Sequence, residues 1–185
     1  MEGYQGDNGL GKPPYGLAPC IGPACRVLIL GSYPSVISLT RGQYYGNPRN
    51  GFWQIIGAVL GISPTLPYEE RIARLIDQGA GLSDIYAGCH RSGSADATIT
   101  SGIFTRFPDL ITLAPGIRII FLNGRTAQAG WKRYCSSDEC TPHIRDLPAE
   151  YLPSSSPAHT MPLADKMRVW DQVRVMLEWE TDTPE

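Results

Sequence analysis

Short apolar runs alternate along the chain with longer segments in which apolar residues recur at helical spacing. The short runs predict strands, and they cover residues 27–30, 81–86, 117–122 and 150–153. The helical segments are Phe52–Leu60, a run opened by Pro67, and residues 103–113, 125–134 and 163–179. Strands that alternate with helices in this way predict an α/β fold with a parallel sheet and crossover helices.

The remaining segments lack such periodicity. The polar stretch 87–100, rich in Gly and Ser, predicts a loop. Residues 1–15, rich in Gly and Pro, predict a flexible N-terminal segment, and we expect residues 16–180 to form a single domain. A length of 185 residues with 42% hydrophobic content suits one domain with a well-filled core.

Polar and aromatic side chains gather directly after the first predicted strand. Residues 31–35 (GSYPS) follow the strand; then come two tyrosines, the cluster Asn47-Pro48-Arg49-Asn50 and the pair Phe52-Trp53. A loop that offers an amide, a guanidinium and an aromatic ring indicates a pocket for a flat, hydrogen-bonding ligand. In open α/β sheets such pockets lie beyond the carboxyl ends of the strands.

The overall charge narrows the range of partners only slightly. A net charge of -2 and a pI of about 5.9 argue weakly against a general polyanion binder, but a local basic patch is compatible with them. Lys12, Lys132 and Lys166 are the only lysines, and the arginines that dominate the cations suit bidentate phosphate contacts. No apolar run approaches the roughly 20 residues of a membrane helix, and no secretory signal opens the chain. We therefore expect a cytoplasmic protein that does not enter a membrane.

Five cysteines raise the question of a metal site. Cys20/Cys25 and Cys135/Cys140 form two C-x4-C pairs, and Cys89 stands alone. This spacing is looser than the C-x2-C of most zinc sites, so these residues are conceivable ligands of zinc or an iron–sulfur cluster, or simply small buried or surface thiols. We expect no metal and no cofactor. The chain also lacks G-x-G-x-x-G, a P-loop, G-x-S-x-G and H-E-x-x-H, which argues against several common enzyme classes.

Three separated segments carry specific motifs. The first is LILGSYPSVISL followed by YYGNPRNGFW, close to the pattern LILGSFPS and YYxHPRNxFW; the others are IFLNGRTA and LPSSSPAH, similar to FLNGxTA and LPSTSPAx. The weaker segment LSDIYAGCHRSGSADATI also fits. Together, in this order and at this spacing, they resemble the uracil-DNA glycosylase superfamily, and specifically its hypoxanthine-DNA glycosylase (DNA-deoxyinosine glycosylase) branch. The resemblance covers about residues 26–170.

The resemblance implies a three-layer α/β fold, with a central four-stranded parallel sheet flanked by helices and an active groove at the strand ends. It implies a DNA glycosylase of base-excision repair that everts a nucleotide and hydrolyses the N-glycosidic bond of a deaminated base, hypoxanthine or uracil. The partner would be DNA containing deaminated bases, and we expect a monomer. None of the three lysines falls in a motif, so we expect a monofunctional enzyme without lyase activity.

The resemblance places the base-binding residues on two loops at the strand ends. Phe52 falls where the superfamily stacks the flipped base, and Asp84 where relatives carry a base-reading Asn; Ser32 and Tyr33 complete the set. A carboxylate only accepts hydrogen bonds, so Asp84 opposite a ring N–H would favour deaminated bases over adenine and cytosine. From the residues alone, Phe52 also fits a core position that opens a helix, and Asp84 also fits a turn or a helix N-cap.

Asn50 is our candidate for the catalytic residue. Many members of the superfamily carry Asp, Asn or Glu at the third position of the first loop, where this chain has Tyr33, and this shifts the role to Asn50. Its amide would accept a hydrogen bond from the attacking water and align it with an oxocarbenium-like sugar. An Asx-turn after Pro48 is the alternative role. Asn47 departs from the His that the branch usually has.

The LPSSSPAH segment resembles the superfamily's loop that pinches phosphates and enters the minor groove. Its residues are Ser154, Ser155, Ser156, Pro157, Ala158 and His159, and Arg49 would contact phosphate or brace the pocket. Ser154 matches the place of a His or Asn near the leaving base, and Ala158 and His159 would form the wedge. His159 equally fits an ordinary surface histidine.

Two further functions stay open at this point. The first is a non-catalytic nucleic-acid-binding protein of the same fold, altered by the change at Asn47. The second is an iron–sulfur-bearing relative of the uracil-DNA glycosylases, which would use the cysteines.

Overall fold

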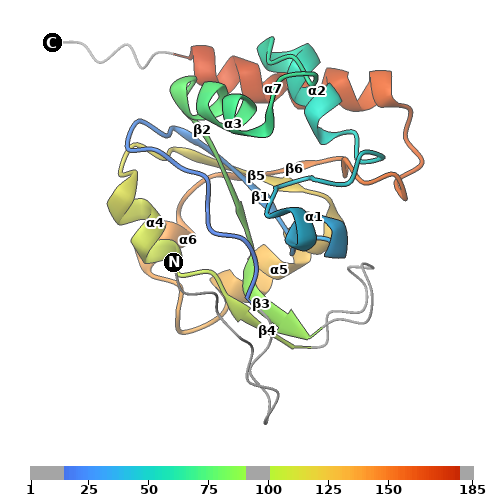
Figure 1. The fold of residues 1–185 in the computed structure, drawn as a ribbon. Helices are drawn as coiled ribbons and strands as arrows, with labels where there is room; N and C mark the ends of the chain where they lie inside the picture. Colours follow the sequence, from blue (N-terminus) through green and yellow to red (C-terminus); the bar gives the residue numbers. More distant parts are fainter. Residues whose placement is uncertain (1–14, 91–100, 180–185) are drawn as a thin grey trace, which may run out of the picture.

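The structure, a computed structural model, describes residues 15–90 and 101–179. Its centre is a sheet of four parallel strands in the order β2-β1-β5-β6 (Figure 1). The strands are β1 (Val27–Gly31), β2 (Ala80–Asp84), β5 (Ile119–Asn123) and β6 (Ala149–Leu152). They coincide with the four predicted runs, with ends that differ by one or two residues, and the predicted α/β class is confirmed.

Side chains of the central strands alternate between the two faces of the sheet. In β1, Val27 and Ile29 pack into one core, whereas Leu28 and Leu30 pack into the other. All five residues of this strand are buried. A strand covered on both faces needs a continuous apolar sequence, which is why this run was readable in the sequence.

Three helices cover one face of the sheet, above it in Figure 1. They are α2 (Phe52–Leu60), α3 (Tyr68–Asp77) and α7 (Leu163–Glu178). Helix α7 packs against α2, and Trp170, on its predicted apolar stripe, is fully buried. These helices confirm the sequence prediction closely, because each has one strongly apolar face.

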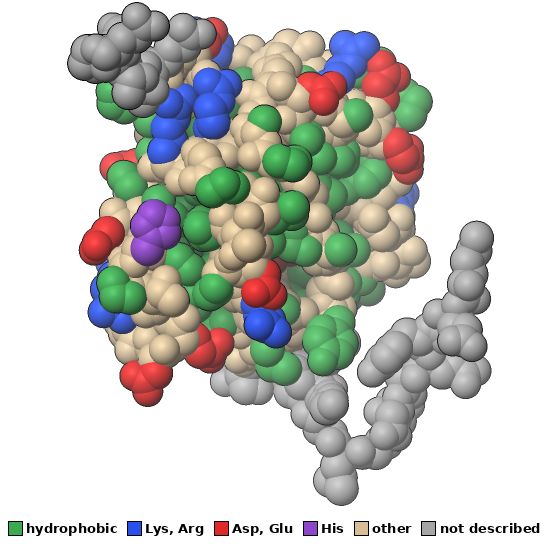
Figure 2. All heavy atoms as spheres, turned by 90° about the vertical axis from the view of Figure 1, so that its left-hand side faces the viewer, with side chains coloured by type: hydrophobic (Ala, Val, Ile, Leu, Met, Phe, Trp, Pro, Cys, Tyr) green, Lys and Arg blue, Asp and Glu red, His purple; other side chains and the backbone are tan. Residues whose placement is uncertain are grey.

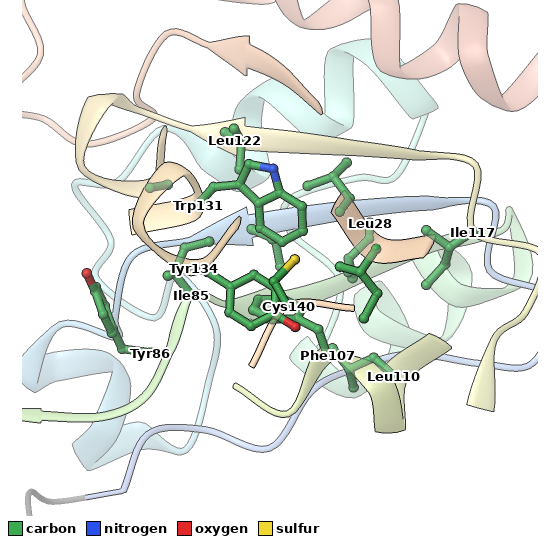
Figure 3. Close-up of a cluster of buried hydrophobic side chains, with 14 of the residues drawn as sticks. Leu28, Ile85, Tyr86, Phe107, Leu110, Ile117, Leu122, Trp131, Tyr134 and Cys140 are labelled. Atoms are coloured by element: carbon green, nitrogen blue, oxygen red, sulfur yellow. The ribbon is translucent and has the colours of Figure 1, made fainter. Parts of the chain in front are cut away.

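The other face is covered by α4 (Phe107–Leu113), α5 (Arg125–Cys135) and the short α6 (Pro142–Arg145). Figure 3 shows Phe107, Trp131 and Tyr134 converging there with aliphatic side chains from the sheet. The rings of Phe107 and Trp131 meet edge to face, with centroids 5.2 Å apart. The sheet therefore lies between two helical layers, as the three-layer expectation requires.

A β-hairpin replaces part of the predicted loop and part of a predicted helix. Strand β3 (Tyr86–His90) pairs antiparallel with β4 (Ser101–Phe104), and helix α4 begins only at Phe107. The rings of Tyr86 and Phe104 stack across the hairpin with centroids 5.5 Å apart. The prediction of a loop over 87–100 was wrong for its first residues, and the helix predicted from Ile103 was wrong at its start. Residues 91–100 lie outside the described part of the chain.

Helix α1 (Val36–Arg41) was not predicted from the sequence. Ser35 caps it, because its Oγ accepts a hydrogen bond of 3.1 Å from the N–H of Ser38. Gly42 ends it in the left-handed conformation, with φ of 63°. Helix α1 has six residues and α6 has four, so neither is long enough to display an apolar period.

The segment before β1 covers the outer edge of β2. The N–H of Cys20 donates to the carbonyl of Leu82 at 2.9 Å, and the N–H of Leu82 donates back at 2.8 Å. Further back, the N–H of Gly16 donates to the carbonyl of Ala87 at 2.7 Å. We call residues 16–22 the edge strap; it occupies backbone groups that β2 would otherwise present to solvent.

The side of the molecule that lies at the left of Figure 1 carries interspersed acidic and basic side chains among apolar ones (Figure 2). It lies over α4 and α6, away from the loop that joins β6 to α7. Within the described residues, no helix is both long enough and apolar enough to cross a bilayer.

Candidate active site

The order of the strands creates a crevice at the carboxyl ends of β1 and β5. From β1 the chain turns to β2 on one side and later crosses to β5 on the other side. Ligands in open α/β folds bind at such switch points. A cavity of about 100 Å³ lies here, lined by residues 31–35, Ser38, Tyr44, Tyr45, Asn50, Asp84, Asn123 and residues 154–156. The polar segments predicted to meet at the strand ends therefore do meet.

The loop after β1 forms one wall of this cavity. Ser32 and Tyr33 both line the cavity, although only 6% and 7% of their surfaces are exposed. The ring of Tyr33 also packs into the core that α4 and α5 share. The carbonyl of Ser32 accepts the N–H of Tyr86 at 3.1 Å, which fixes the loop to the start of the hairpin.

Asp84 lies beside Gly31, at the end of the neighbouring strand. The two residues are register partners in the β1–β2 ladder. Any Cβ at position 31 would clash with the Asp84 carboxylate, so glycine is what lets this carboxylate reach the cavity. Asp84 is 6% exposed, and the hydroxyl of Thr105 donates to its backbone carbonyl at 2.6 Å. The expected placement of Asp84 in the pocket thus agrees with the geometry.

Phe52 does not face the cavity, which corrects its predicted place. Its side chain is fully buried, and Tyr45 lies flat against it, with centroids 3.7 Å apart and ring planes inclined by 12°. Phe52 also meets Trp170 edge to face. It is a core residue at the start of a helix, and Tyr45, which lies flat against it, lines the cavity together with Tyr33 and Tyr44.

Tyr45 was missed by sequence reasoning, although two adjacent tyrosines before the Asn47-Pro48 pair were a visible signal. Among the described residues it is the one non-glycine residue with positive φ, at 54°. This conformation costs free energy for a bulky residue and persists only where the surroundings enforce it. Such strain is typical of residues that function requires in one orientation.

Asn50 lines the cavity, as predicted for a catalytic residue. Its Oδ1 accepts a hydrogen bond of 3.0 Å from the N–H of Phe52, which orients the amide. An amide oxygen has two lone pairs, so Oδ1 retains the capacity to accept a second hydrogen bond. Asn47 makes an equivalent bond, from the N–H of Arg49 at 3.0 Å, but lies outside the cavity lining; Arg49 is exposed and is also outside it.

Asn123 is the second residue that sequence reasoning missed. Its Nδ2 donates to the Tyr45 hydroxyl at 3.0 Å and to the Ser155 hydroxyl at 2.9 Å, and its Oδ1 accepts the N–H of Ser155 at 2.9 Å. One side chain at the end of β5 therefore connects the aromatic wall to the loop after β6. The signal was available, because Asn123 directly follows the clearest apolar strand.

Residues 154–159 form the loop after β6, and the structure places only its first half in the cavity. Ser154, Ser155 and Ser156 line the cavity, and Ser155 is almost completely buried. Pro157 and Ala158 are exposed at the tip, which suits the wedge expected of Ala158.

His159, the other residue expected in the wedge, is less exposed than Pro157 and Ala158. Its Nδ1 accepts the N–H of Met161 at 3.4 Å, and its own N–H donates to the carbonyl of Ser156 at 3.1 Å. The imidazole thus faces its own loop, and the exposed tip consists of Pro157 and Ala158 alone.

The five cysteines, which were conceivable metal ligands from the sequence, lie outside the cavity lining. In the described ranges, no group of three or more Cys, His, Asp and Glu side chains could hold a metal ion. The conceivable ligands Cys20, Cys25, Cys89, Cys135 and Cys140 are therefore not gathered into such a group within the described ranges.

Packing explains why these residues do not assemble into a ligand set. The first C-x4-C pair is divided between the two cores, because Cys20 packs on the α2 and α7 side of the sheet and Cys25 on the α4 and α5 side. Cys89 and Cys140 are buried in the second of these cores, and Cys135 packs against it. The Cys140 thiol donates to the carbonyl of Thr141 at 3.6 Å. These positions suit small packed thiols.

The acidity of two of the thiols agrees with this packing. Burial raises the pKa of the Cys25 thiol to about 12 and that of Cys135 to about 11. Both groups are therefore protonated thiols at neutral pH, as suits small packed side chains.

The assembled cavity has an aromatic wall, an acceptor carboxylate and an oriented amide. A flat heterocycle can stack on Tyr45 while its polar edge meets the carboxylate of Asp84. The amide of Asn50 lies on the same cavity and can orient a water molecule. These parts suit hydrolysis of a bond to a flat base.

Comparison with known proteins agrees with this geometry. A hypoxanthine DNA glycosylase from Methanosarcina barkeri is 30% identical over 158 residues, which cover 84% of this chain and 94% of that protein. One from Methanosarcina acetivorans is 34% identical over 151 residues, covering 80% and 89%. A solution NMR structure of a candidate uracil DNA glycosylase from Methanosarcina acetivorans matches with a TM-score of 0.70 and 28% identity, covering 86% of this chain and 98% of that one. The model of the uracil DNA glycosylase superfamily matches residues 19–179, and this chain therefore belongs to that superfamily.

Proposed function

We propose that this DNA glycosylase releases hypoxanthine from DNA by hydrolysing its N-glycosidic bond. The observation that carries the proposal is the convergence of Tyr45, Asp84 and Asn50 on one cavity at the switch point of the sheet. Two relatives that align over most of their length are named hypoxanthine DNA glycosylases, which supports this base over uracil.

Base recognition is assigned to Tyr45 and Asp84. The everted base stacks on the cavity face of Tyr45, whose other face rests on Phe52; stacking of this kind contributes about 1–3 kcal/mol per base. The Asp84 carboxylate accepts the ring N–H that hypoxanthine and uracil both present beside a carbonyl. Adenine and cytosine offer a lone pair at that position, which a carboxylate repels.

Catalysis is assigned to Asn50. The N–H of Phe52 fixes the amide oxygen, and the remaining lone pair of that oxygen accepts a hydrogen bond from the attacking water. An amide is a weak base, so its contribution is to place water beneath a sugar that has already become cationic as the base departs.

The lysines support a monofunctional reaction. Lys132 is exposed on α5. Lys166 is buried and is not among the residues that line the cavity, and its ammonium is held by the backbone carbonyls of Ser156 and His159. Lys12 lies outside the described residues. With neither described lysine at the cavity, the enzyme leaves an abasic site and does not cleave the strand.

A panel of oligonucleotides tests the proposal. Duplexes that carry deoxyinosine, deoxyuridine or deoxyxanthosine are incubated with enzyme and then divided, and one half is treated with alkali. We expect cleavage of the deoxyinosine strand only after alkali. Cleavage without alkali would contradict the monofunctional assignment. Tight binding without any base release would favour a non-catalytic DNA-binding protein instead.

A further inference from the structure

Lys166 is a buried cation next to the loop after β6. It lies in the first turn of α7 and is 4% exposed. Its Nζ donates to the carbonyl of Ser156 at 3.3 Å and to the carbonyl of His159 at 3.1 Å. Residues 156–159 form a turn closed by the N–H of His159 on the Ser156 carbonyl, so the ammonium binds both ends of one turn.

This placement costs stability in two ways. Burial lowers the pKa of Lys166, because the charged form loses hydration. A cation in the first turn also opposes the helix dipole, and Asp165, the acidic residue of that turn, is paired with Arg168 at 2.8 Å. No carboxylate of the described residues forms an ion pair with Lys166. A buried cation without a carboxylate partner at a helix N-terminus is unfavourable for stability, and such an arrangement is expected where function requires it.

The loop is otherwise held at its first half only. Asn123 binds Ser155, and the carbonyl of Ser155 accepts the N–H of Gly51 at 2.9 Å. The exposed tip, Pro157 and Ala158, projects from the turn that Lys166 closes. Without the ammonium, that turn keeps only hydrogen bonds to residues of its own loop.

We infer that Lys166 is a positioning residue that holds the Pro157–Ala158 tip in the shape needed to displace the target nucleotide from the duplex, an inference that rests on the proposed function. It acts through the two carbonyls and does not touch the base. Its contribution is made while the nucleotide is being everted. A single-stranded target needs little or no eversion, so it escapes this requirement.

Lys166→Met tests the inference on deoxyinosine in duplex and in single-stranded form, under single-turnover conditions. We expect the duplex rate to fall at least about tenfold more than the single-strand rate, since two hydrogen bonds to a charged group are lost. Lys166→Arg, which retains charge and donors, restores part of the duplex rate. Lys132→Met, the same change at an exposed site on α5, leaves both rates unchanged.

Fluorescence of 2-aminopurine beside the target gives a readout that needs no base release. If wild type releases no hypoxanthine, the proposed function fails, whereas this signal still reports eversion. Lys166→Gln is measured in parallel, in case the methionine variant does not fold; its side chain is uncharged and one bond shorter than that of lysine, so it cannot reproduce both contacts of the ammonium. A folded Lys166 variant without the ammonium that keeps the wild-type ratio of duplex to single-strand rates, or the wild-type fluorescence change, overturns the inference.

Discussion

The ring of Tyr45 lies parallel to that of Phe52, with centroids 3.7 Å apart. Phe52 is fully buried, so its other contacts are with the core, whereas Tyr45 borders the cavity. The pair therefore divides two roles between adjacent layers. The inner ring, Phe52, stabilises the fold, and the outer ring, Tyr45, forms part of the cavity wall.

Alanine substitutions separate these roles. We expect Tyr45→Ala to lower kcat/KM for deoxyinosine by roughly 5- to 150-fold, as loss of about 1–3 kcal/mol of stacking implies. Phe52→Ala should instead lower the free energy of unfolding by about 3–5 kcal/mol, because it opens a cavity in the core. Urea unfolding and steady-state kinetics measure the two effects. Normal kinetics in a folded Tyr45→Ala enzyme would contradict the assignment of the base to this ring.

Asn50→Ala should abolish most of the chemistry while DNA affinity stays close to wild type. Removal of a group that orients the reacting centre typically costs about 10²–10³ in rate. Single-turnover release of hypoxanthine and binding to abasic-site DNA measure the two properties. Asn47→Ala is the matched control, because it also removes an amide that accepts a loop N–H at 3.0 Å but does not line the cavity. Equal rates for the two variants would exclude Asn50 as the catalytic residue.

Asp84→Asn should weaken discrimination between hypoxanthine and adenine. The amide offers a donor as well as an acceptor, so it no longer requires a ring N–H on the base. We expect hypoxanthine release to fall at least about tenfold and the ratio of hypoxanthine to adenine release to narrow. Asp109→Asn, at an exposed surface ion pair, is the control and should have no effect on either rate. An unchanged ratio in Asp84→Asn would argue that another group reads the base.

Alkaline pH should destabilise the fold partly through Cys25. Burial raises the pKa of its thiol from 9.0 to about 12, so between these pH values the unfolded chain has lost this proton and the folded chain has kept it. The unfolded state then binds fewer protons, and the free energy of unfolding falls as pH rises. Urea unfolding is measured at pH 8, 9 and 10, which roughly spans the pH at which cysteine in the unfolded chain begins to lose its proton. The free energy of unfolding should depend less steeply on pH for Cys25→Ala than for wild type. Identical slopes would refute this contribution.

Sequence reasoning located the fold well because its central strands and long helices each carry a strong apolar pattern. The strand 117–122 is one example, since both of its faces are buried. The helix Phe52–Leu60 is another, since one of its faces is buried. The strands at residues 86–90 and 101–104 were not predicted, because a hairpin that is only partly covered carries no continuous apolar run. The stacking of Tyr86 on Phe104, which holds the hairpin together, joins residues that are distant in the sequence.

Within the site, the sequence predicted which loops meet but not which aromatic ring faces the cavity. Adjacent aromatic residues at 44, 45, 52 and 53 all fit a stacking role, and only the packing of α2 against the sheet determines that Phe52 lies behind Tyr45. Asp84 and Asn50 were chosen from the resemblance. Both line the cavity, which lies where the order of the parallel strands brings their carboxyl ends together. Asn123 lies at such a strand end as well, and it was overlooked because its dipeptide with Gly124 resembles an ordinary turn.

The edge strap at residues 16–22 has a bearing on solubility. The backbone of Cys20 forms two hydrogen bonds with Leu82, so these groups at the edge of the central sheet cannot pair with a second chain. An unprotected strand edge can pair with a strand of another molecule and so promote aggregation. A short irregular segment thus occupies edge groups that a bare outer strand would offer to another chain.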